Sequence, residues 1–257
     1  MKKTLILLTA LILFIPSIVF SDIISFKVGY FIPRAQYDNP DDNLWQIEFD
    51  QMDFTKSSFQ NTNFGFGYEY FLSREISIVL NISGYNKKKP GAYNDYVGYS
   101  DYDGDWAYPE DFEGEFVPSH TFSVSITPIQ ISLKLTPMGR RAKIIPYVGG
   151  GVGVYMWNVR LYGDMIDFDD PWIDEDWNVE IYPIDYYDTR EENRFSIGYH
   201  VFGGIMIPVA NRISLEAEFK YNFSKGTLGK DPDWGFQGFE PFDLGGYHIS
   251  IGLNYWF

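Results

Sequence analysis

Beyond residue 22 the chain alternates between apolar residues and small or polar ones in eight separate segments. A period of two is typical of β-strands whose two faces meet different surroundings. The predicted strands span roughly residues 24–32, 63–72, 75–85, 120–136, 144–157, 194–207, 212–223 and 246–257. No apolar run after residue 22 has the roughly 20 residues that a membrane-spanning helix needs.

The fourth segment changes phase in the middle. Its apolar residues are even-numbered at first (Phe122, Val124 and Ile126) and odd-numbered later (Ile129, Ile131, Leu133 and Leu135). Pro128 lies between the two sets and has no backbone N–H to give to a strand ladder. One inserted residue would explain both observations, so we predict a β-bulge near Pro128.

Connections of two lengths separate the predicted strands. Those near residues 73–74, 137–143 and 208–211 are short, whereas those at 33–62, 86–119, 158–193 and 224–244 are long. Short turns at one rim and long loops at the other are typical of outer-membrane barrels. The pattern predicts an all-β fold: an eight-stranded antiparallel transmembrane β-barrel with short periplasmic turns and long extracellular loops.

Alternation alone does not say which face points outward, because a soluble lipocalin-like barrel has its apolar face inside. The polar face of the strands contains only six charged residues, three of each sign, which is sparse for a surface in water: Lys27, Glu69, Lys134, Glu216, Glu218 and Lys220. The apolar face has almost no polar group, as contact with hydrocarbon requires. We therefore expect the apolar face to meet lipid and the six charges to form a paired network in a narrow lumen.

The N-terminus has the organisation of an export signal. Lys2 and Lys3 precede an uncharged stretch from Thr4 to Phe20, and Ser21 provides a small residue at the expected cleavage point. We expect residues 1–21 to be a cleaved signal peptide and residues 22–257 to be the barrel, placed in the outer membrane of a Gram-negative-type envelope. The alternative is an uncleaved membrane anchor.

Three segments resemble the small outer-membrane barrels of the OmpA, OmpX and OmpW type. Residues 145–155 resemble their fifth strand, and residues 203–219 resemble their hairpin between strands six and seven. The ending from Tyr247 to Phe257 resembles the terminal strand that the barrel-assembly machinery recognises, which implies that Tyr255 and Phe257 act as an assembly signal. The OmpW type also implies an alternative function, a narrow passive channel for small solutes.

Acidic residues gather in the long connections, which hold 30 of the 35 in the chain, together with five of the seven tryptophans. This distribution favours a non-enzymatic protein whose acidic, aromatic-rich extracellular face makes envelope or surface contacts, with outer-membrane lipids and lipopolysaccharide as partners. Asp101, Asp103 and Asp105 alternate in the second connection, and hard carboxylate oxygens at this spacing suit Ca²⁺ or Mg²⁺.

Other chemistry has little support. The chain has no cysteine, and its net charge of −15 disfavours nucleic acid as a partner. Two lumen-facing histidines, His200 and His248, lie near Ser196 and Ser250 in the predicted strands, which leaves a barrel enzyme acting on lipid as a third hypothesis. We expect no catalytic residue, no cofactor apart from such loop-bound cations, and a monomer.

Overall fold

The computed structural model describes residues 22–35, 43–139, 142–229, 236, 239 and 241–257. The predicted signal peptide, residues 1–21, lies outside them. The strands are β1 (Ile23–Pro33), β2 (Asn61–Phe71), β3 (Ile76–Ala92), β4 (Tyr96–Asp101), β5 (Gly104–Pro109), β6 (Ser119–Leu135), β7 (Ile145–Ile166), β8 (Trp172–Asp174), β9 (Val179–Ala210), β10 (Ile213–Gly226), β11 (Phe242–Asp243) and β12 (Gly246–Trp256). The helices are α2 (Leu44–Gln51) and the 3₁₀ turn η2 (Lys56–Phe59). No helix in the described ranges is both long and apolar enough to span a bilayer.

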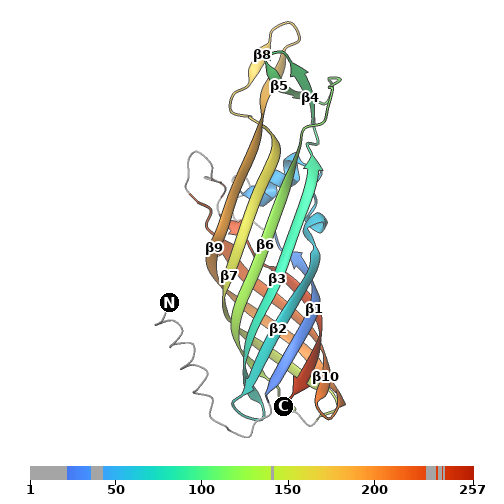
Figure 1. Ribbon diagram of the computed structural model, residues 1–257, viewed down its shortest axis with the longest axis vertical. Coiled ribbons are helices and arrows are strands. Elements are labelled where there is room, and N and C mark those ends of the chain that lie inside the picture. Colours follow the sequence, from blue (N-terminus) through green and yellow to red (C-terminus); the bar gives the residue numbers. More distant parts are fainter. Residues whose placement is uncertain (1–21, 36–42, 140–141, 230–235, 237–238, 240) are drawn as a thin grey trace.

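Eight of these strands close into a barrel within the described residues (Figure 1). The order is β1–β2–β3–β6–β7–β9–β10–β12, and β12 pairs back onto β1 from Ile23↔Trp256 to Pro33↔Gly246. Every neighbouring pair is antiparallel. The short turns and the end of β12 lie together at the lower end in Figure 1. This confirms the predicted eight-stranded antiparallel barrel.

The outside of the barrel is apolar on all of its strands. The exposed side chains include Phe26, Phe66, Leu80, Ile131, Val152, Ile197, Leu215 and Ile251, one from each strand. Aromatic side chains flank this surface at both ends. Tyr199, Phe223, Tyr221 and Tyr247 form a chain of ring contacts of 4.2–4.5 Å at one end, and Tyr255 stacks with Phe257 at the other. An apolar band between aromatic girdles is the exterior of a transmembrane barrel, so the lipocalin-like alternative is excluded.

Four barrel strands continue past the apolar band. The connections predicted at 86–119 and 158–193 are largely β-structure, because β3, β7 and β9 extend into them. Strands β5 and β8 pair with β9, and β4 pairs with β5. Figure 1 shows this extension at the top of the molecule. We call residues 86–125 and 158–193 the blade. Its strand pairing makes it a continuation of the barrel wall rather than a set of separate loops.

The predicted β-bulge at Pro128 is wrong. Pairing of β6 with β7 runs in one register from His120↔Gly163 to Leu135↔Val148, and pairing with β3 keeps one register on both sides of Pro128. All even-numbered residues of β6 point inward. Phe122, Val124 and Ile126 are buried above Pro128, and Gln130 and Ser132 are buried below it. The phase change is therefore a reversal of polarity between inside and outside, which occurs where the strand leaves the membrane.

The tight packing of β6 against β7 gives a test of the barrel geometry. A Cβ added to Gly151 would lie 2.0 Å from the Ile131 carbonyl oxygen, whereas one added to Gly84 would meet nothing within 4 Å. Gly151→Val should therefore prevent the compact barrel from forming, and the matched Gly84→Val should leave it intact. The measurement is the mobility of refolded protein on unboiled gels. Normal heat-modifiable migration of the Gly151 variant would contradict this wall packing.

Candidate functional site: a filled lumen and an extracellular blade

The structure places the six predicted lumen charges in one connected group. Lys27 on β1 lies 2.6 Å from Glu218 and 3.3 Å from Glu216, both on β10. Gly252 of β12 is the register partner of both Lys27 and Glu216, so the missing side chain leaves room for this contact across the intervening strand. Lys27 thus turns toward β10 rather than toward Glu69 on the neighbouring strand β2.

The other members extend the group across the lumen. Lys134 contacts Glu69 at 2.8 Å and Glu216 at 3.9 Å, and Lys220 contacts Glu218 at 3.6 Å. The Tyr147 hydroxyl donates to the carboxylates of both Glu216 and Glu218. Three ammonium and three carboxylate groups thus balance each other in a buried space, where an unpaired charge would be strongly unfavourable.

The two lumen histidines contact other polar side chains of the barrel interior. His248 contacts the side-chain amides of Asn63 and Asn222 at 2.9 and 2.7 Å. His200 contacts Ser132 at 2.7 Å, and its Nδ1 has no hydrogen-bond partner among the described residues. A serine–histidine nucleophile needs a third group that orients the imidazole and a route for substrate. Ser132 and His200 are both buried inside the barrel.

An aromatic plug closes the extracellular end of the lumen above this polar layer. Trp45 on α2 is only 1% exposed and stacks on Phe242, with ring centroids 5.2 Å apart. It also meets Phe59 and Phe122 edge-on, and its indole N–H donates to the Asp243 carbonyl at 3.0 Å. We call α2, η2 and β11 with these side chains the plug. Its packing on Phe122 joins it to the barrel wall.

Polar contacts hold the plug to several barrel strands. Arg34, just beyond β1, makes two hydrogen bonds of 2.8 and 2.9 Å to the Asp243 carboxylate, and this contact raises the pKa of the Arg34 guanidinium. Glu48 on α2 contacts His120 on β6 at 2.8 Å, and both side chains are buried. The Tyr85 hydroxyl on β3 donates a hydrogen bond to the Phe59 carbonyl oxygen on η2, and β11 pairs with β10.

A second apolar layer fills the lumen near the short turns. Ile145, Tyr147, Phe202 and Met206 form a buried cluster there, and Trp256 packs partly against it. Between the two apolar layers, two cavities lined by described residues measure about 20 and 10 Å³. A water molecule needs roughly 10–15 Å³ of such volume, so these spaces suit single waters and not solutes.

The blade presents an acidic, aromatic tip. Trp106 and Trp172 meet edge-to-face at 5.5 Å, while Trp177 and Tyr186 are 71% and 73% exposed. Exposed carboxylates surround them, including Asp169, Asp170, Glu175, Asp176 and Glu180. A hydrogen bond from the Tyr182 hydroxyl to Glu180 raises the pKa of Tyr182 to about 12. The tip thus combines negative charge with aromatic faces, both of which attract cations.

The predicted metal residues Asp101, Asp103 and Asp105 lie on the hairpin between β4 and β5. Asp101 pairs with Gly104, and Ser100 pairs with Asp105, so Asp101 and Asp105 point to opposite faces of this hairpin. The Asp101 carboxylate accepts the backbone N–H of Tyr102 at 2.6 Å. No cluster of three metal-ligating side chains occurs within the described residues. The segment is a pair of strands and not a loop, so the Asp101 and Asp105 carboxylates are separated although they are close in sequence.

Sequence reasoning missed the plug. The residues that form it were assigned to connections, and Trp45 was counted only as part of an acidic loop. The inward run of Phe122, Val124 and Ile126, followed on β7 by buried Tyr155 and Trp157, was the available signal. Large apolar residues on the lumen side of two paired strands indicate that something apolar packs against them.

Comparisons with solved structures find similar chains at low identity. Neisserial surface protein A is 11% identical, covers 92% of this chain and 97% of its own, and has a TM-score of 0.45. The outer membrane protein OprG from Pseudomonas aeruginosa is 13% identical over 92% of this chain and 95% of its own, with a TM-score of 0.47. The attachment invasion locus protein Ail of Yersinia pestis is 9% identical over 93% and 100%, with a TM-score of 0.39.

No protein-family model matches the chain, and the comparison with curated proteins finds no match either. At such identities the likeness concerns the fold alone. The strand pairing and the apolar exterior establish that fold independently: the chain is a small β-barrel of the outer-membrane type.

The charge group makes a prediction about stability. Lys27→Met leaves Glu216 and Glu218 buried with one fewer counter-charge, and breaking a buried pair costs about 3–5 kcal/mol. Asp188→Asn removes the 2.6 Å Arg160–Asp188 contact, which is exposed, and should cost only about 0–1 kcal/mol. Urea unfolding in detergent micelles measures both. Equal effects of the two substitutions would mean that the lumen charges do not stabilise the barrel.

Proposed function

We propose that this protein is a closed, non-enzymatic integral outer-membrane barrel that presents its blade outside the cell as a binding surface for a cationic partner. The observation that supports this most directly is that β7 and β9 stay paired from the membrane band into the blade, with a bulge at Asn158 and a regular ladder beyond it through Ile166↔Ile184. A surface built on paired strands loses little conformational entropy on binding, because it is ordered beforehand.

The filled lumen favours this function over a narrow solute channel. Three layers lie in series: the plug, the charge group and the apolar cluster around Tyr147. A conducting pore would need a connected aqueous path, whereas porins with such a path have many more strands. The charges are better explained as mutual partners than as a pore lining.

The chemistry of the tip supports a cationic partner. Trp172 and Trp177 are exposed at the end of the blade, next to the carboxylates of Asp174 and Asp176. Lysine and arginine side chains gain from both the carboxylates and the ring faces. A protein with a net charge of −15 would also attract such a partner over distances of about a Debye length.

The remaining assignments belong to the same proposal. Residues 1–21 act as a cleaved export signal, and residues 22–257 form the barrel. Tyr255 and Phe257, which are exposed at the end of β12, serve as the assembly signal for the barrel-assembly machinery. The partners in the membrane are outer-membrane lipids and lipopolysaccharide, and the protein acts as a monomer.

A conductance measurement distinguishes the proposed closed barrel from the channel. Refolded protein inserted into planar bilayers should show no steady ion current, because the lumen layers leave space only for single water molecules. Insertion is verified independently by protease protection in vesicles of the same lipid. Reproducible unitary currents from inserted protein would refute the closed barrel and favour the channel.

Binding of an oligoarginine peptide tests the blade. Affinity should fall as salt is raised, and Trp177→Ala should weaken binding by roughly two- to fivefold, the effect of about 0.5–1 kcal/mol for an exposed cation–π contact. Met138→Ala, at the exposed short-turn rim, is the matched control and should leave binding unchanged. Binding that is independent of salt, or equal in the two variants, would contradict the cationic partner.

A further inference from the structure

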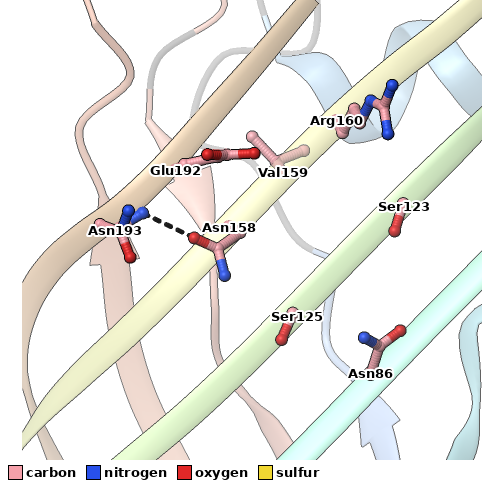
Figure 2. A pocket seen from close by; sticks show the side chains of 8 residues that line it. All are labelled: Asn86, Ser123, Ser125, Asn158, Val159, Arg160, Glu192 and Asn193. Atoms are coloured by element: carbon pink, nitrogen blue, oxygen red, sulfur yellow. Dashed lines mark hydrogen bonds between the residues drawn. The ribbon is translucent and has the colours of Figure 1, made fainter.

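A polar groove lies on the outer wall of the barrel, immediately above the apolar band. It has a volume of about 310 Å³. Its lining comes from four neighbouring strands, β3, β6, β7 and β9: Asn86, Ser123, Ser125, Asn158, Val159, Arg160, Glu192 and Asn193. Figure 2 shows Asn158, Ser125 and Asn86 following one another across three strands. The groove faces the surroundings of the barrel rather than its lumen.

The strand register fixes the height of the groove relative to the membrane. Asn86 pairs with Ser125, and Ser125 pairs with Asn158, so these three form one row across the wall. Four residues lower on the same strands, Ile82, Ile129 and Val154 form an exposed apolar row. At about 3.3 Å per residue the two rows are roughly 13 Å apart. The groove therefore lies at the level where lipid headgroups meet the wall.

A local bulge shapes the groove. Trp157 pairs with Arg194 and Val159 pairs with Glu191, so Asn158 faces two residues of β9. One of them, Asn193, has φ of +54°, a left-handed conformation that asparagine tolerates better than most residues. Its backbone N–H donates to Asn158 Oδ1 at 2.6 Å, the dashed line in Figure 2. Bulges of this kind re-aim side chains next to binding sites.

The two charged side chains that line the groove, Arg160 and Glu192, are both in ion pairs. Arg160 makes hydrogen bonds of 2.7 and 2.6 Å to Asp188, and this guanidinium holds the pKa of Asp188 below its usual value. Glu192 contacts Arg190 at 3.6 Å. Lys88, one row higher, lies 4.9 Å from the centre of the Tyr162 ring and adds one positive charge above the groove. The lining itself thus offers no net charge to a phosphate, whereas its amides and hydroxyls can both donate and accept hydrogen bonds.

We propose that this groove binds the sugar headgroup of a glycolipid whose acyl chains lie against the apolar wall below it. A sugar ring offers several hydroxyl groups that each donate and accept, which matches Asn86, Ser125 and Asn158 in one row. The apolar row at Ile82, Ile129 and Val154 supplies the adjoining surface for hydrocarbon. A free sugar would use only the upper half of this arrangement, so the membrane-anchored form is favoured. The groove lies at the base of the blade, and this proposal does not depend on the cationic partner proposed for the blade tip.

The absence of cysteine from the sequence allows a direct test. Ser125→Cys places one thiol in the groove. Thr62→Cys is the matched control, because Thr62 is exposed on β2, two residues beyond the Phe64↔Gly84 pair, and does not line the groove. Each variant is refolded into phosphatidylcholine nanodiscs, and its alkylation rate is measured with a water-soluble maleimide. The additions are monoglucosyl diacylglycerol, phosphatidylglycerol, or free methyl glucoside.

The expected result is selective protection of the thiol at position 125. Monoglucosyl diacylglycerol should slow its alkylation about tenfold when the lipid is present at roughly ten times its dissociation constant. Phosphatidylglycerol should leave the rate unchanged, and Thr62→Cys should react equally in all nanodiscs. Adding Asn158→Ala, or separately Asn86→Ala, to Ser125→Cys should restore rapid alkylation, with gel mobility before and after boiling showing that the barrel is folded.

Each other outcome overturns the proposal. Equal protection at positions 62 and 125, or protection by phosphatidylglycerol, would indicate general crowding by headgroups. Protection by free methyl glucoside at the same concentration would indicate a soluble saccharide as the ligand. Undiminished protection in both folded asparagine variants would show that the amides do not contact the sugar. No protection at position 125 would leave the groove without this ligand.

Discussion

The hydrocarbon of the membrane is the constraint on which the rest of this structure depends. It offers no hydrogen-bond partner, so the backbone must satisfy itself through a closed ladder, and the outer side chains must be apolar. With only eight strands, the interior is too narrow for an aqueous channel and is filled by side chains. The charged groups that the outer wall excludes therefore meet inside, where Lys27 is within hydrogen-bond distance of both Glu216 and Glu218.

Contact with hydrocarbon ends where the strands leave the membrane. Beyond that point the outward side chains are polar and the inward side chains are apolar. On β6 the outward residues change from Ile129 to Ser125 and Ser123, while the inward residues change from Gln130 to Ile126 and Val124. An apolar interior above the membrane requires an apolar filling, which α2 and Trp45 provide. The plug thus covers the apolar inner face of the strands above the membrane, and it also closes the lumen.

The reversal also explains why the outer wall can have two kinds of surface on the same strands. Below the boundary it is a lipid-facing surface, and above it a polar one that contains the groove at Asn158. The strands cross this boundary with a bulge between β7 and β9 at Asn158, and their pairing resumes beyond it, so the blade continues the paired wall of the barrel. Local openings with low free energy are expected where such pairing ends, at the blade tip.

The sequence by itself determined the barrel, its strand number and the outward direction of its apolar face, because a period of two and the scarcity of polar groups on one face are local properties. It also identified the six lumen charges as residues of one face. It did not determine their partners, since Lys27 reaches β10 across Gly252 through the closure of the ladder. The phase change at Pro128 was visible in the sequence, but a bulge and a polarity reversal produce the same pattern, and only the register separates them. The separation of Asp101 from Asp105 and the meeting of Asn86, Ser125 and Asn158 were decided by tertiary structure alone, because pairing between distant segments sets which side chains share a face.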